Sequence, residues 1–107
     1  MKQLNAIKIL SAMAHDGRLT LIRHLIQAGP EGVSAGDLAR YAKIGPTTAS
    51  AQLLVLANAG LVRSARSGRQ VNYIAEYQIM SDLLGFLMQD CCSNRPEICK
   101  PVVDACC

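Results

Sequence analysis

The sequence of 107 residues contains no apolar run that approaches the roughly 18 residues needed to cross a bilayer. Lys2 and Lys8 interrupt the apolar residues at its start, so no signal peptide is visible either. We therefore expect a cytoplasmic protein with no membrane partner. A chain of this length should form one domain with its own core, yet it is small enough for a partner chain to matter.

Cysteine is absent from the first 90 residues of the chain. The five cysteines that follow are Cys91, Cys92, Cys99, Cys106 and Cys107. Under reducing conditions such a cluster indicates metal or redox ligands rather than a disulfide framework. Pro96 favours an extended conformation for Arg95, so we expect the chain to turn there and to bring Cys99 toward the first two thiols.

Thiolate sulfurs select soft acceptors, among them trivalent arsenic or antimony, copper(I) and zinc. A structural zinc site takes four ligands, whereas three thiolates satisfy a trivalent metalloid. Cys91, Cys92 and Cys99 supply three and are the predicted ligands. Cys99 is equally spaced from Cys92 and Cys106, so Cys106 and Cys107 could join it instead. A disulfide or persulfide switch between these thiols stays open, while no cofactor motif or nearby base suggests an enzyme.

Acidic residues are absent between Leu38 and Ala75. The basic residues of the same segment are Arg40, Lys43, Arg63, Arg66 and Arg69. The formal net charge is only +3, but its distribution makes the middle of the chain basic. We therefore expect an anionic partner for that segment.

Two helices are expected before residue 30. Apolar residues at helical spacing predict an amphipathic helix over residues 2–14, with a wide apolar stripe that needs a cover. A second helix follows with Asp16 as its expected N-cap, and Gly29-Pro30 ends it. His15 and His24 are far from the cysteines in sequence, so we expect capping or surface roles for them rather than metal binding.

A short helix and a longer one follow a short extended link at residues 32–34. Ser34 and Asp37 form the capping signature of a helix over residues 35–42, and Gly45-Pro46 opens a helix that extends to Gly60. Two helices joined by a few residues including Gly form the helix-turn-helix pattern. The N-terminal part of the second helix enters the major groove in such motifs. The side chains predicted to reach base edges are Thr47, Thr48, Ser50, Ala51 and Gln52.

Two strand-like runs, residues 61–63 and 70–74, surround a loop that contains Gly68 and arginines. Such a hairpin after a helix-turn-helix is a wing, whose arginines can neutralise phosphates or enter the minor groove. From Tyr77 a last helix is too apolar to be covered by one small domain. We expect it to pair, with the first helix, against a second copy of the chain and to deliver Cys91 and Cys92 at its end.

Three segments together resemble the ArsR/SmtB family of winged-helix metal-responsive repressors: AMAHDGRLTLIRHL, VSAGDLARYAKIGPTTASAQLLVLANAGLV and SGRQVNYIA. The resemblance covers nearly the whole chain up to Cys92. It implies a mainly α fold with a small β-hairpin wing (α+β), homodimeric through the first and last helices. It also implies a repressor, not an enzyme, that binds double-stranded operator DNA and releases it when a toxic metal or metalloid binds. Residues 1–92 would form the DNA-binding and dimerisation domain, and residues 93–107 a tail that completes the inducer site.

Departures from the family pattern indicate where the predicted inducer site lies in the chain. Many arsenic-responsive members have Cys-x-Cys at the start of the third helix, where this chain has residues 34–37 without cysteine, and its last helix has no His for a zinc site. The remaining cysteines resemble variant sensors with two adjacent Cys and a third further on, which implies As(III) or Sb(III), inorganic or methylated, as inducer and no required cofactor. Gln52 stands where the family often has His, and it could pair bidentately with adenine.

Overall fold

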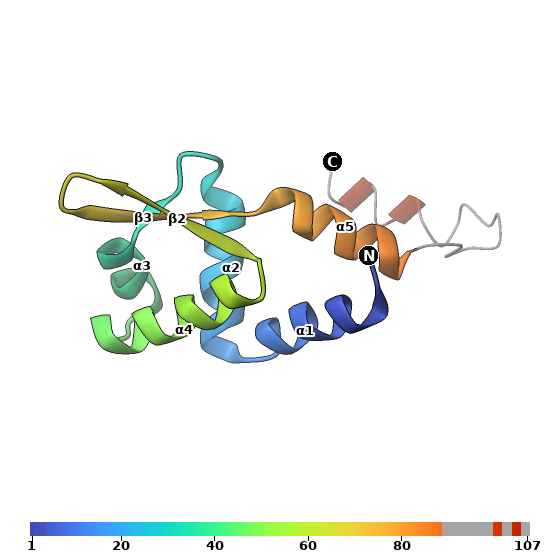
Figure 1. Cartoon of the computed structure of the whole chain (residues 1–107). Coiled ribbons are helices and arrows are strands. Elements are labelled where there is room, and N and C mark those ends of the chain that lie inside the picture. The colour runs from blue at the N-terminus through green and yellow to red at the C-terminus, as the bar shows by residue number, and fades with distance from the viewer. Residues whose placement is uncertain (89–99, 102–103, 106–107) are drawn as a thin grey trace.

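The computed structural model describes residues 1–88, 100–101 and 104–105. Through residue 88 the elements are α1 (Gln3–Met13), α2 (Asp16–Ala28), β1 (Val33–Ser34), α3 (Ala35–Ala42), α4 (Pro46–Asn58), β2 (Val62–Ser67), β3 (Gln70–Ala75) and α5 (Tyr77–Leu87). The β2–β3 hairpin projects from one end of the molecule, and α1 and α5 lie together at the other (Figure 1). This mainly α arrangement with a wing is the predicted winged helix-turn-helix.

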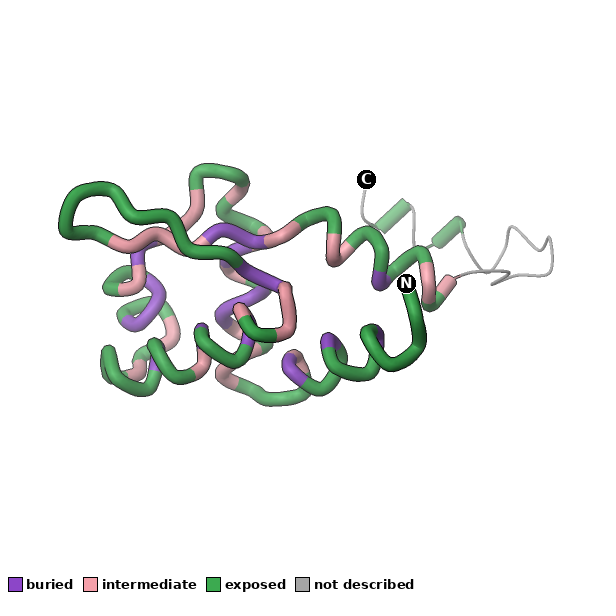
Figure 2. Tube along the Cα trace, viewed as in Figure 1, coloured by how far each residue is buried: buried purple, intermediate pink, exposed green. Residues whose placement is uncertain are grey.

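The core lies where α2, α3 and α4 meet the base of the sheet (Figure 2), and it extends to buried residues of α1 and α5. Its largest fully buried side chains are Leu21, Ile22, Leu25, Leu38, Leu53, Leu56, Leu61 and Leu83. Those on α2 (Leu21, Ile22 and Leu25) and on α4 (Leu53 and Leu56) occur at helical spacing, so one face of each of these two helices points inward. His24 on α2 stacks on Tyr41 of α3, with ring centroids 3.7 Å apart, as a helix-surface residue. The helices that carry the functional surface are therefore fixed to one common core.

The start of α2 differs from the prediction of Asp16 as its N-cap. His15 occupies that position with extended backbone, and its Nδ1 accepts hydrogen bonds from the backbone N–H groups of Gly17 and Arg18, at 3.1 and 3.3 Å. An imidazole nitrogen can replace the usual hydroxyl or carboxylate oxygen because it accepts from the same unpaired donors. Asp16 is instead the first helical residue, where its charge favours the helix dipole. The expectation of a capping role for His15 is met.

The helix-turn-helix is formed by α3 and α4 with a short turn. The Ser34 Oγ accepts the backbone N–H of Asp37 at 3.1 Å, as its capping signature predicts. Lys43 adopts the left-handed conformation with φ of 58° and ends α3, and Pro46 begins α4. Proline suits this position because the first helical N–H has no intrahelical partner. The turn thereby sets the angle between the two helices.

The sheet has the strand order β1-β3-β2 and is antiparallel throughout. The short link expected before the third helix is a strand, because Val33 and Ser34 pair with Tyr73 and Asn72 of β3. The hairpin strands are longer than predicted: β2 runs to Ser67, so most of the expected loop is paired. Only residues 68–69 form the turn, and Gly68 supplies the positive φ of 64° that such a tight connection needs.

The last helix, α5, ends at Leu87 with Met88 as its C-cap. The predicted delivery of Cys91 and Cys92 by this helix lies outside the described residues, as do the other three cysteines. Of the tail, Lys100, Pro101, Asp104 and Ala105 are described, and all four are helical and exposed. Within the described ranges no helix has both the length and the apolar character that a membrane span requires.

Candidate nucleic-acid interface

Helix α4 presents one face to the core and the other to solvent. Ala49, Leu53 and Leu56 are buried against the other helices. The predicted base-contacting residues Thr47, Thr48, Ser50 and Ala51 are all exposed. Because these residues occupy the first half of α4, they lie on the part of a recognition helix that enters a major groove. These four side chains are therefore accessible for contact with base edges.

Gln52 is half-buried and is held by a residue that the sequence analysis did not single out. Arg18 Nη1 donates to the Gln52 Oε1 at 3.0 Å, and Arg18 Nε donates to the carbonyl oxygen of Ala12 at 2.6 Å. Since a guanidinium has only donors, the amide oxygen of Gln52 must be the atom that faces it. Bidentate pairing with adenine needs that oxygen, whereas the amide N–H donors are not engaged by this bond.

The three wing arginines are exposed, but they differ in their surroundings. Arg66 and Arg69 lie at the outer end of the hairpin, where Arg66 is paired opposite Val71 and Arg69 forms the turn. Arg63 lies near the base, and its Nε contacts a carboxylate oxygen of Glu76 at 2.7 Å. An ion-paired guanidinium loses part of its attraction for phosphate. Arg66 and Arg69 are therefore the stronger candidates for backbone contacts.

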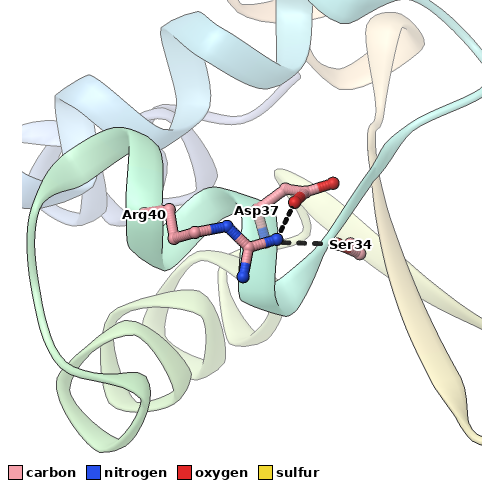
Figure 3. A network of polar contacts seen from close by, with 3 residues as sticks. All are labelled: Ser34, Asp37 and Arg40. Carbon is pink, nitrogen blue, oxygen red and sulfur yellow. Dashed lines mark hydrogen bonds and ion pairs between the residues drawn. The ribbon is translucent and has the colours of Figure 1, made fainter.

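Arg40 and Lys43 are both exposed on the helix-turn-helix. Arg40 is paired with Asp37 one turn earlier, next to the Ser34 cap (Figure 3). Hydrogen bonds from the Arg40 guanidinium and from Ser34, with the positive charge of Arg40, lower the pKa of Asp37 from its ordinary value of 3.8. Asp37 is thus ionised at neutral pH and offsets part of the charge of Arg40, while Lys43 shows no such pair in the described part of the chain.

The structure brings Arg40 and Arg69 to the same groove, although they are distant in sequence. An open groove of about 380 Å³ between α3 and the wing is lined by Ser34, Ala35, Gly36, Arg40, Arg69, Gln70 and Val71. Two arginines that line one groove, from α3 and from the wing turn, suit a phosphate backbone that crosses from the helix-turn-helix to the wing. Ser34 of β1 and Gln70 and Val71 of β3 line this groove, and the pairing of these two strands has no signature in the sequence.

The predicted metal ligands cannot be placed, since Cys91, Cys92, Cys99, Cys106 and Cys107 all lie outside the described residues. Within the ranges that are described, no group of three His, Cys, Asp or Glu side chains could hold a metal ion. His15 and His24 serve as a cap and a stacking partner.

This fold, with an exposed uncharged helix framed by cations of which Lys43, Arg66 and Arg69 have no acidic partner among the described residues, defines a winged helix-turn-helix DNA-binding protein. No protein-family model and no curated protein sequence matches the chain. Solved structures do: the transcriptional repressor BigR from Xylella fastidiosa is 30% identical, with 77% of this chain and 81% of that chain covered and a TM-score of 0.63. The chain belongs to the ArsR family of winged helix-turn-helix transcriptional regulators.

Two further structures bear on oligomeric state and chemistry. A homodimeric winged helix-turn-helix DNA-binding domain of a possible ArsR-family regulator from Mycobacterium bovis is 26% identical, covering 78% of this chain and 82% of that chain with a TM-score of 0.62. The reduced form of HlyU from Vibrio cholerae is 27% identical, covering 80% of this chain and 90% of that chain with a TM-score of 0.62.

Proposed function

We propose that the protein is a homodimeric repressor that binds operator DNA and releases it when As(III) or Sb(III) binds Cys91, Cys92 and Cys99. DNA binding is supported mainly by the exposed surface of α4 and the wing. Arg66, Arg69 and Lys43 lie on it without an acidic partner among the described residues. Each cation that neutralises a phosphate releases counterions and makes binding salt-dependent.

Dimerisation is supported by the apolar residues that α1 and α5 leave uncovered. Leu4 is 80% exposed, and Ile7 and Leu10 continue the same stripe along α1. Leu84 and Leu87 are about half exposed on α5, which contacts α1. Apolar area of this kind is stabilised by covering it, and a second copy offers the same stripe in return. The homodimeric relative from M. bovis supports the same assembly.

The inducer part of the proposal is supported by the chemistry of the sequence. Three thiolates match the coordination of a trivalent metalloid. Arg95 and Lys100 are close in sequence and favour the thiolate over the thiol. Because metal binding must displace thiol protons, the affinity for inducer should rise with pH until the thiols ionise on their own.

Fluorescence anisotropy of a labelled DNA fragment from upstream of the protein's own gene tests the proposal, with reductant present and arsenite titrated into the complex. We expect release at low arsenite for the parent chain and none for Cys99→Ser, which should bind DNA equally well. Ala105, close to Cys106 but not a ligand, gives the control Ala105→Ser. Release that survives unchanged in Cys99→Ser would remove Cys99 from the site.

The dimer is tested separately by sedimentation at micromolar concentration. Leu84→Glu places a charge within the apolar stripe and should shift the chain toward monomer. Leu54→Glu, an equally exposed leucine on α4, is the control and should remain dimeric. A parent chain that sediments as a monomer, or a Leu84→Glu variant that is still a stable dimer, would contradict this assembly.

A second candidate function is a repressor of the same fold that senses oxidants or persulfides. The similarity to HlyU, which has been solved in a reduced form, favours this alternative. Oxidation would form a disulfide between Cys91 or Cys92 and Cys99 and transfer two electrons to the oxidant. Peptide mass mapping after oxidant treatment distinguishes the two: a disulfide that abolishes DNA binding, with no effect of arsenite, identifies the redox switch.

A further inference from the structure

The exposed face of α4 is lined with methyl groups and carries no charge. Residues 46–58 contain no Asp, Glu, Lys, Arg or His. The exposed residues that bear methyl groups are Thr47, Thr48, Ala51, Leu54 and Val55. Their spacing of three, four and seven positions places them on one side of the helix, opposite the buried Ala49 and Leu53. The recognition helix therefore offers an apolar strip to its partner.

The strip is open to solvent. Leu54 is 61% exposed, and Val55 is 39% exposed and lines a pocket with Lys8, Ser11 and Ala12 of α1. In Figure 2 the outer side of α4 is exposed along its length while its inner side is buried. Burial of such side chains is favourable, so a partner that covers them gains affinity.

The surroundings of the strip determine which partner fits. Lys43 precedes α4, and Arg66 and Arg69 lie on the neighbouring wing. The acidic residues that flank this segment, Asp37 and Glu76, are each paired with an arginine. A polyanion with apolar groups between its charges would complement this surface. A DNA major groove has this character, because phosphates form its rims and thymine 5-methyl groups project from its floor.

We propose that α4 recognises its operator half-site through thymine 5-methyl groups, contacted by Thr47, Ala51 and Leu54. This inference rests on the proposed operator binding and states which base feature is recognised. Methyl contacts distinguish thymine from cytosine and from uracil without any hydrogen bond to the base. Gln52 adds amide N–H donors at the edge of the strip, since its oxygen is engaged by Arg18. The half-site is accordingly rich in thymine on the strands that face α4.

Replacing half-site thymines by deoxyuridine tests the inference, because the change removes one methyl group and keeps every base-pairing atom. We expect the affinity to fall about fourfold for each contacted methyl, the effect of burying one such group. The dependence of binding on salt should stay the same, since no phosphate contact changes. Deoxyuridine outside the footprint is the control for altered DNA flexibility.

The matching protein variant is Thr47→Ser, which removes the γ-methyl group and keeps the hydroxyl. It should lose discrimination between thymine and uracil at one position and retain it elsewhere. Thr20→Ser on α2, whose hydroxyl donates to the carbonyl oxygen of Asp16, is the control and should discriminate like the parent chain.

The outcomes separate the two proposals. Equal affinity for thymine and uracil fragments that both bind would overturn methyl recognition and leave operator binding intact. Absence of binding to either fragment would count against operator binding itself. Binding to vesicles of anionic phospholipid with an affinity equal to that for DNA would overturn the inference as well, because the strip would then serve a lipid surface.

Discussion

Replacement of Arg18 by Met tests how the recognition helix is held, because this one side chain connects three helices. From α2 it donates to the Ala12 carbonyl oxygen at the end of α1 and to the Gln52 amide oxygen on α4, at 2.6 and 3.0 Å. Met has a similar length and no donors. Each hydrogen bond from a charged group contributes about 1.5 to 3 kcal/mol. Since both sites are only part-buried and water can replace some of this, we expect a loss of about 2 to 3 kcal/mol in the free energy of unfolding.

A double-mutant cycle identifies the part that belongs to the contact with α4. Gln52→Met removes only that bond and should cost about 1 kcal/mol. In the double variant the same bond can be lost only once, so the two effects should fall short of additivity by about 1 kcal/mol. Urea denaturation measures all four chains, provided that the slope with denaturant is unchanged.

DNA affinity provides the functional measurement for the same cycle. Without the bond, one of the contacts that position α4 against α2 is lost, so both single variants should bind operator more weakly while they remain folded. Arg18→Lys, which can satisfy one acceptor but not both, should give an intermediate result. Additive stabilities, or unchanged affinity in both single variants, would refute the idea that Arg18 positions the recognition helix.

Four further variants follow from the geometry. Gly32→Ala should lower the free energy of unfolding, measured by urea denaturation, by at least about 3 kcal/mol. The backbone φ of Gly32 is 78°, and an added Cβ would lie 2.5 Å from the carbonyl oxygen of Tyr73 on β3. A variant as stable as the parent chain would contradict this. Arg69→Gln should reduce the slope of log DNA affinity against log salt concentration by about one. Arg63→Gln should reduce it by less, because Arg63 is paired with Glu76. Equal slopes in the two variants would contradict this difference. The pKa of Asp37 measured by NMR should lie below 3.8 and rise in Arg40→Gln. The pKa of Asp37 is lower in the folded chain than in the unfolded chain, so its pair with Arg40 stabilises the folded protein at neutral pH. That contribution is lost as the pH falls from 3.8 through the pKa of the folded state.

Sequence patterns predicted the elements whose signals are local. Capping by Ser34, the proline start of α4 and the glycine turn of the wing depend on neighbouring residues, and all three are confirmed. The N-cap of α2 was wrong because Asp16 is the commoner capping residue, whereas the backbone angles place His15 there. Such choices between adjacent residues are decided by how the preceding helix ends, which composition does not reveal.

Features that depend on distant contacts could not be predicted in the same way. Pairing of β1 with β3 joins residues far apart in sequence, and a run of two residues gives no periodicity. The Arg18–Gln52 bond joins residues 34 positions apart. The ion pair between Arg63 and Glu76 likewise distinguishes one wing arginine from the others only in three dimensions. The predicted cysteine site stays a prediction, because it lies beyond the described residues.

Ser34 links the helix-turn-helix to the wing through two contacts. It caps α3 and also pairs with Asn72 in the wing, while β3 leads within one residue, Glu76, into α5. The helix-turn-helix and the wing are thus joined by the pairing of β1 with β3, and α3 and α4 also contact the wing strands, so the two parts should move as a single unit about α5. A small rotation of α5 against a partner subunit would shift the groove contacts and the phosphate contacts together. We therefore expect release of DNA in a single concerted step rather than in stages.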